Sequence, residues 1–172
     1  MVNTSVLFVC LGNICRSPTA HAVFQSMVDR AGLTDRINVD GAGTGDWHLG
    51  HPPDSRSAAT ALLRGYDMST LRSRLVAVDD FSSFDYIIAM DADNLKNLKA
   101  MGPTNFSGQL KLLLDFSSKP EYQEISEVPD PYYGGEDGSN LTSTGSIASG
   151  LMAGYNPVSG SNFLNKISGG FL

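Results

Sequence analysis

The residues with the clearest chemical potential lie near the N-terminus, where Cys10 and Arg16 are separated by five residues and Ser17 follows directly. Backbone N–H groups and a cation around a cysteine stabilise its thiolate, which is the nucleophilic form of the side chain. A guanidinium offers two parallel donors that match two phosphate oxygens. The pattern therefore favours attack of a sulfur on the phosphorus of a phosphate ester.

The rest of this segment is predicted to form the wall of an anion site. It follows the apolar run Val6–Val9, a buried strand, and it leads into a helix that Ser17 and Pro18 are expected to open. Such a loop aims several backbone N–H groups at one point, and the helix dipole adds to their field. The predicted loop residues are Leu11, Gly12, Asn13, Ile14, Cys15 and Ser17. We expect Gly12 to permit the turn and the Ser17 hydroxyl to contact the sulfur.

A phosphate ester also needs a proton donor for its leaving oxygen, and Asp130 is the predicted donor. Pro131 stiffens the chain beside it, and Tyr132 and Tyr133 offer aromatic walls for a flat substrate. The same carboxylate, once deprotonated, is expected to activate the water that hydrolyses the cysteinyl-phosphate.

Strands and helices alternate along the chain, which predicts an α/β fold with a parallel sheet and right-handed crossovers. After the first strand and helix, Gly32 is expected to end that helix. The further predicted strands are Ile37–Val39, Tyr86–Met90 and Leu110–Leu113, and the further predicted helices begin at Asp54 and Asp91. Asp91 also opens a short acidic run that hints at a calcium loop, but the glycine and glutamate of such a loop are missing, and a helix cap is preferred.

The segment Cys10–Pro18 resembles the signature of low-molecular-weight protein tyrosine phosphatases, and Asp130–Tyr133 resembles the acid loop of that family. Asp46-Trp47 and Met90-Asp91 are similar to two further family segments, so the resemblance covers about residues 4–135. It implies a four-stranded parallel sheet in the order 2-1-3-4, flanked by helices. It also implies a protein phosphotyrosine substrate and a reaction without metal or cofactor.

Roles follow from this resemblance residue by residue. Cys10 would be the nucleophile, Arg16 the transition-state clamp and Asp130 the general acid and base. Asn13 and Ser17 would shape the loop, and Cys15 would form a reversible disulfide with the nucleophile after oxidation. The residues expected to line the substrate pocket are Leu11, Trp47, Tyr132 and Tyr133.

Three features depart from the family pattern. Gly41 and Leu71 stand where the family commonly has a serine and a histidine that brace the loop asparagine. Residues 136–172 are rich in Gly and Ser and do not resemble the usual closing helix. We therefore predict a phosphatase domain over residues 1–135 and an atypical C-terminal segment over residues 136–172.

Composition limits the other classes of function. The chain has 172 residues and a formal net charge of −6, without the basic stripe of a nucleic-acid binder. It has no apolar run long enough to span a bilayer and no basic residue before its first apolar run. Its two cysteines fit a reducing compartment, so we expect a cytoplasmic protein that is a monomer or a weak dimer. A tyrosine kinase that acts on the same substrates is a partner implied by the family.

Three alternatives share the predicted loop. An arsenate reductase needs a further downstream cysteine, and no cysteine follows Cys15. Phosphoarginine phosphatases favour threonine where Ile14 stands, and a bulky Ile14 favours a planar aryl ester instead. A phosphate-binding module without turnover is the third alternative, and intact Cys10, Arg16 and Asp130 argue against it.

Overall fold

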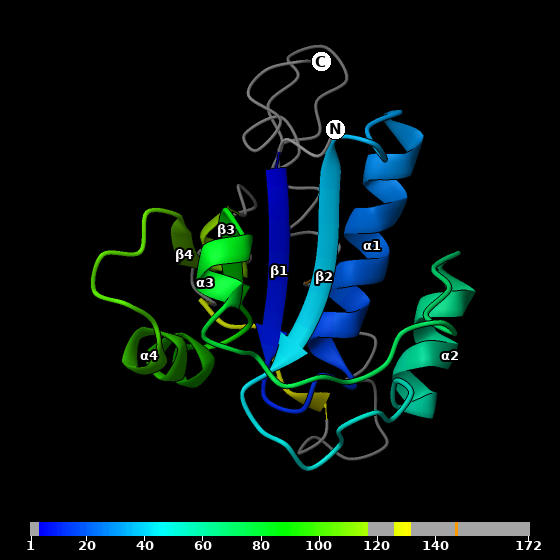
Figure 1. Ribbon diagram of the computed structural model, residues 1–172. Helices are drawn as coiled ribbons and strands as arrows, with labels where there is room; N and C mark the ends of the chain where they lie inside the picture. Colours follow the sequence, from blue (N-terminus) through cyan, green and yellow to red (C-terminus); the bar gives the residue numbers. More distant parts are fainter. Residues whose placement is uncertain (1–3, 117–125, 132–146, 148–172) are drawn as a thin grey trace.

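A computed structural model describes residues 4–116, 126–131 and 147 of the chain (Figure 1). Helices and strands alternate in it as the sequence predicts. The strands are β1 (Thr4–Cys10), β2 (Ile37–Gly43), β3 (Tyr86–Ala89) and β4 (Gln109–Leu112), and the helices are α1 (Arg16–Arg30), α2 (Ser55–Leu63), α3 (Asp80–Ser83), α4 (Ala92–Met101) and the 3-10 helix η1 (Leu113–Phe116).

The four strands form one parallel sheet in the order β2-β1-β3-β4, which confirms the predicted fold class and strand order. β1 lies inside the sheet, and its residues Val6–Val9 are fully buried. A parallel strand that is covered on both faces must be apolar along its whole length, which is why this run does not alternate with polar residues.

Helices cover both faces of the sheet (Figure 1). On one side Val6 and Phe8 pack in a cluster with Phe24 of α1, whose ring meets the Phe8 ring edge-on at a centroid distance of 5.7 Å. On the other side Leu7 and Val9 pack with Leu98 of α4. Alternate residues of β1 thus supply two cores, and each large apolar side chain contributes about 1.5–3 kcal/mol through burial.

Several predicted element ends are confirmed. The Asp54 carboxylate caps α2 by accepting from the N–H groups of Arg56 and Ser57. Asp91 caps α4 in a reciprocal capping box with Asn94, as a helix cap and not a calcium loop. Gly32, just past the end of α1, has a φ of 69°.

Other expectations about the elements were wrong. Ser17 does not cap α1, because the helix begins at Arg16 and Ser17 is fully buried inside its first turn. β2 extends beyond the predicted range to Gly43. The short helices α3 and η1 were not predicted, since each spans only four residues.

Most of the C-terminal segment lies outside the described residues, so the division at residue 135 stays a prediction. Ile147 is the exception: it is helical, fully buried and part of the α1-side core. Within residues 4–116, 126–131 and 147, no helix is long and apolar enough to cross a membrane.

Candidate active site

The candidate site lies at the carboxyl edge of the sheet, where Cys10 ends β1 and Gly43 ends β2. The neighbouring strand β3 ends one residue before Met90 and two before Asp91. In a parallel sheet the loops that follow these strands meet at one edge, which is where open α/β folds bind ligands. The arrowheads of β1 and β2 point to this edge in Figure 1.

The loop from Cys10 to Arg16 is held with its main-chain carbonyls facing outward. Carbonyl oxygens of Cys10, Leu11, Gly12, Ile14 and Cys15 accept hydrogen bonds from Thr44 N, Gly45 N, Ser73 Oγ, Asp54 N and Thr19 N at 3.0, 2.9, 3.0, 2.8 and 3.2 Å. In a trans peptide the next N–H points away from the carbonyl, and no described peptide is cis. The N–H groups of residues 11, 12, 13, 15 and 16 therefore turn toward the inside of the loop.

One of these inward N–H groups already contacts the sulfur. The N–H of Asn13 donates to Cys10 Sγ at 3.2 Å, and the side chain of Cys10 is 3% exposed. Asn13 takes the left-handed conformation at φ 53°, which Asn tolerates better than most residues. The tight turn thus lies at Asn13 and not at Gly12, where we expected it. A Cβ at Gly43 would lie 2.7 Å from the Leu11 carbonyl oxygen, so the loop also requires a glycine at the end of β2.

The Ser17 hydroxyl lies between the sulfur and the Asn13 amide. Its oxygen is 3.1 Å from Cys10 Sγ, 2.7 Å from Asn13 Oδ1 and 3.3 Å from the carbonyl oxygen of Ala42. A hydroxyl has one proton for these three acceptors. The shortest of these contacts is the donation to Asn13 Oδ1. A thiolate at Cys10 would compete for the same proton, because it alone of the three acceptors would carry a full charge.

Arg16 closes the loop and is 2% exposed. It donates to Asp91 Oδ2, to the carbonyl oxygen of Val128 at 3.1 Å and to Asp130 Oδ2 at 3.0 Å. Burial by itself lowers the pKa of the guanidinium. The charges of Cys10, Asp130 and Asp91 raise this pKa by more than burial lowers it, so the group stays a cation in the loop.

Asp130 is positioned by a short segment that is tied to the sheet. Val128, fully in the core, donates its N–H to the Met90 carbonyl oxygen at 2.8 Å and accepts from Arg16 with its own carbonyl. Asp130 follows two residues later, between Pro129 and Pro131, which restrict the chain on both sides. The sequence-predicted proton donor therefore lies beside the sequence-predicted clamp, although 114 residues separate them.

A cavity of about 410 Å³ opens over the loop. It is lined by Cys10, Leu11, Gly12, Ile14, Cys15, Arg16, Trp47, His48 and Asp130. Of the predicted pocket residues, Leu11 and Trp47 are thus at the cavity, and Trp47 is 68% exposed at its rim. Asn13 and Ser17 are not among the residues that line this cavity, and Tyr132 and Tyr133 lie outside the described residues.

The two cysteines differ in environment. Burial raises the pKa of the Cys15 thiol to about 12, and the negative charges of Asp54, Cys10 and Asp130 act in the same direction. A hydrogen bond with Ser57 opposes this shift without reversing it. Cys15 is therefore a neutral thiol at physiological pH.

Two residues of the site were not predicted for it. We assigned Asp91 only to a helix cap and the end of a strand, whereas its second oxygen binds Arg16. Its place after the strand next to β1 was a usable signal, because adjacent parallel strands end at one edge. His48 was not among the predicted site residues, and its ring lies at the cavity, with its Cδ2 3.1 Å from where a Cβ at Gly12 would stand.

The two departures at residues 41 and 71 leave Asn13 with other partners. Its amide nitrogen donates to the Gly41 carbonyl oxygen at 3.4 Å, and its oxygen accepts from Ser17. A Cβ at Gly41 would lie 3.1 Å from Asn13 Oδ1, so the glycine brings the β2 backbone close to the amide. Beyond it, a small cavity of about 180 Å³ reaches Leu71.

A parallel α/β sheet with an inward-facing amide loop, a buried arginine and a cysteine at the loop's centre defines a cysteine-dependent phosphatase. Residues 5–145 match the family model described as low molecular weight phosphotyrosine protein phosphatase. The chain is 43% identical to the low molecular weight protein-tyrosine-phosphatase YfkJ of Bacillus subtilis, over 82% of this chain and 90% of that protein.

Solved structures show the same similarity. A crystal structure of a protein tyrosine phosphatase from Entamoeba histolytica has a TM-score of 0.79 and 38% identity, over 86% of this chain and 92% of that one. A crystal structure of DARP, a Drosophila arginine phosphatase, has a TM-score of 0.77 and 32% identity, over 84% and 91%. The chain belongs to the low molecular weight phosphotyrosine protein phosphatase family, and it is a hydrolase that acts on phosphoproteins.

Proposed function

We propose that the chain hydrolyses phosphotyrosine in proteins through a phosphate ester formed on Cys10. The observation that carries this proposal is the orientation of the loop. Five of its carbonyls bond outward, so the N–H groups that follow them face the inside of the loop, and the N–H of Asn13 contacts the sulfur. Such an arrangement binds a phosphate dianion and keeps a thiolate next to it. Arg16 and Asp130 at the same cavity supply a clamp and a proton donor.

Substrate binding is proposed to exchange one ion pair for another. Arg16 donates to Asp130 through Nη2, and a phosphate oxygen in the loop would compete for that donor. When the guanidinium turns to the phosphate, the Asp130 carboxyl loses its cation and takes up a proton more readily. Asp91 keeps its contact with the other terminal nitrogen and so holds Arg16 in the loop during the exchange.

The reaction then has two steps. The Cys10 sulfur forms a bond to phosphorus while the bond to the tyrosine oxygen breaks, and the departing oxygen takes the Asp130 proton. Asp130, now a carboxylate, removes a proton from water as the water oxygen bonds to phosphorus. The S–P electron pair returns to Cys10, and the Ser17 hydroxyl stabilises the thiolate that re-forms.

The cavity wall supports an aryl ester as the substrate. Trp47 exposes most of its ring at the rim, and Leu11 and Ile14 supply apolar wall within. A phenyl ring gains from both stacking and burial at such a site. We further propose that the physiological substrates are made by a tyrosine kinase, and that the protein works in the cytoplasm, where its thiols stay reduced, as a monomer or weak dimer.

Phosphoarginine hydrolysis is the second candidate, because the chain superimposes on DARP over most of its length. Ile14 at the cavity wall argues for the aryl ester, since its branched side chain narrows the space beside the phosphate. Comparing kcat/KM for one peptide with phosphotyrosine and one with phosphoarginine decides between them. We expect the phosphotyrosine peptide to be preferred.

Hydrolysis of p-nitrophenyl phosphate tests the mechanism. We expect turnover that survives EDTA, disappears in Cys10→Ser and falls about a hundredfold or more in Asp130→Ala. Equal activity of Cys10→Ser and the wild type would refute the mechanism. Phosphate binding without turnover would favour the non-catalytic module, and arsenate-dependent thiol oxidation would favour the reductase.

A further inference from the structure

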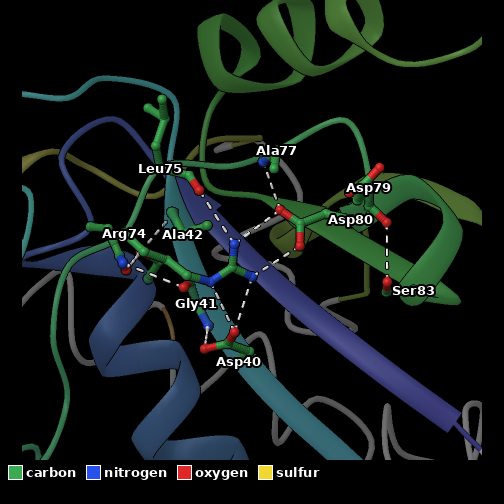
Figure 2. Close-up of polar contacts among 11 residues, drawn as sticks. Asp40, Gly41, Ala42, Arg74, Leu75, Ala77, Asp79, Asp80 and Ser83 are labelled. Atoms are coloured by element: carbon green, nitrogen blue, oxygen red, sulfur yellow. Dashed lines mark hydrogen bonds and ion pairs between the residues drawn. The ribbon is translucent and has the colours of Figure 1, made fainter.

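A second arginine, Arg74, has two carboxylate partners and lies next to the edge strand β2 (Figure 2). Arg74 Nε donates to Asp40 Oδ2 at 3.0 Å, and its terminal nitrogens donate to the two oxygens of Asp80 at 3.0 and 3.1 Å. The side chain of Arg74 is 35% exposed and that of Asp80 is 10% exposed. Burial lowers the pKa of Arg74, but hydrogen bonds and charges of Asp80 and Asp40 raise it by more.

Both carboxylates are also bound to the backbone, which fixes their positions. Asp40 Oδ1 accepts from the N–H of Gly41 at 2.8 Å, and Asp80 Oδ2 accepts from the N–H of Ala77 at 2.8 Å. The Arg74 carbonyl oxygen in turn accepts from the N–H at the end of β2. Arg74 therefore connects the segment before α3 to the last residues of β2, as the dashed contacts in Figure 2 show.

A continuous series of hydrogen bonds leads from this cluster to the nucleophile. Gly41, whose N–H is held by Asp40, accepts from the Asn13 amide with its carbonyl. The oxygen of the same amide accepts from Ser17, whose hydroxyl is 3.1 Å from the sulfur. Asn13 has a left-handed backbone, a conformation that persists only when its surroundings hold it.

We infer that Arg74 is a positioning residue for the phosphatase reaction, which acts through Asp40, Gly41 and the Asn13 amide on the hydroxyl that faces the sulfur. The inference rests on the proposed function of Cys10 as nucleophile. Without Arg74, the Asp40 carboxylate is free to turn toward solvent and to release the Gly41 N–H. The backbone on both sides of the Gly41 Cα is then held less firmly, so the carbonyl that accepts from the Asn13 amide can shift. Ser17, which donates to that amide, loses its fixed position next to the sulfur.

A purely structural role for the cluster predicts something different. Partly exposed ion pairs contribute little to stability, and their loss alone leaves the sulfur unchanged. The two readings therefore differ in the ionisation of Cys10. The rate of its alkylation by iodoacetate follows the thiolate fraction and needs no phosphatase turnover.

The first test compares Arg74→Ala with the matched control Arg72→Ala. Arg72 is exposed, and it donates to the carbonyl oxygens of Ser69 and Leu71 in its own segment. We expect kcat/KM for p-nitrophenyl phosphate to fall about threefold to thirtyfold in Arg74→Ala. When the alkylation rate is plotted against pH, its rise on the acid side (the acid limb) should move to higher pH in Arg74→Ala. The acid limb should stay in place in Arg72→Ala. An unmoved limb in Arg74→Ala would overturn the inference.

A double-mutant cycle separates positioning from other effects. Asn13→Gly removes the amide that carries the coupling, while glycine accepts the left-handed backbone. In the Asn13→Gly background, Arg74→Ala should lower the alkylation rate and kcat/KM by less than about twofold. The hydrogen bonds that connect Arg74 to Ser17 are already interrupted in that background. The same fold-loss in both backgrounds would refute the claim that Arg74 acts through the Asn13 amide.

Arg74→Lys keeps the charge but cannot contact both carboxylates as a fork does. It should show the same direction of change as Arg74→Ala, and it replaces that variant in the cycle if the alanine protein does not fold. A wild-type acid limb in Arg74→Lys would show that charge alone matters and would overturn the inference. Absence of wild-type turnover would instead contradict the proposed function, because the alkylation cycle still reports on the positioning of the sulfur.

Discussion

Two arginines in this fold each bind a pair of aspartates, and the pairs differ in what holds them. Asp40 and Asp80, the partners of Arg74, also accept from backbone N–H groups. Of the partners of Arg16, Asp91 caps a helix, whereas Asp130 lies on the short segment between two prolines. Arg16 thus has one partner fixed by a helix end and one on a loop that faces the cavity, and Arg74 has two fixed by the backbone.

This difference distinguishes an ion pair that holds a structure from one that can exchange with a substrate. A carboxylate that accepts from both an arginine and a backbone N–H has one fixed orientation as long as both donors are in place. Arg16 sits at the bottom of a cavity and has a partner that a phosphate oxygen can replace. Arg74 lies next to β2, where it contacts the Asp40 side chain and accepts from the Gly43 N–H.

The largest effect should come from replacing the Arg16 guanidinium, which has two parallel donors. We expect Arg16→Lys to lower kcat/KM by about a hundredfold to a thousandfold, because one compact ammonium cannot donate to two phosphate oxygens in the transition state. Arg74→Lys should lose far less. Steady-state kinetics on p-nitrophenyl phosphate compares the two, and equal losses would erase the distinction between them.

A smaller effect, on stability, should follow from removing a carboxylate beside Arg74. Asp80→Ala leaves two guanidinium donors and the Ala77 N–H without their acceptor, so the free energy of unfolding should fall by about 1–3 kcal/mol. Urea unfolding measures it. Asp79→Ala is the control, since the Asp79 side chain makes no cap hydrogen bond to α3. A loss of equal size in both variants would show that the Arg74 contacts add nothing.

The smallest expected effect is a loss of stability at alkaline pH that comes from Cys15, the neighbour of Arg16 in the loop. The pKa of Cys15 rises from 9.0 to about 12 in the folded chain, so its proton is retained there after the unfolded chain has lost it. Stability from this group is complete below pH 9 and declines as pH rises above it, by about 1 kcal/mol per pH unit. Thermal unfolding from pH 8 to 10.5 should show a shallower decline in Cys15→Ala than in the wild type.

The fold was predictable because its signals are local. An apolar strand that needs cover on both faces, capped helices and glycine stops specify alternating elements, and the strand order followed from the family resemblance. The caps at Asp54 and Asp91 were predicted correctly because an aspartate directly before a helical run is a favoured N-cap. The wrong prediction of Ser17 as an N-cap shows where local signals fail. The Ser17 hydroxyl contacts the Cys10 sulfur, and α1 begins one residue earlier.

The site was only partly predictable, for a physical reason. Cys10 and Arg16 lie in one contiguous motif, so their spacing carried the information. Asp91 meets Arg16 across 75 residues and His48 reaches the cavity from another loop. Arg74 has no motif at all, and its position matters only through hydrogen bonds that the folded backbone creates.

The two backbone hydrogen bonds of Val128 have a consequence for substrate selectivity. With its N–H on Met90 and its carbonyl on Arg16, this residue leaves Asp130 a reach of only two residues, about 7 Å of chain at full extension. In the proposed mechanism, the Asp130 carboxyl can therefore deliver its proton only within a short distance of Val128. A phosphate ester then reacts only if its bridging oxygen lies within reach of Asp130 while its phosphorus lies next to the Cys10 sulfur. The restricted position of Asp130 thus selects substrates by their length and shape.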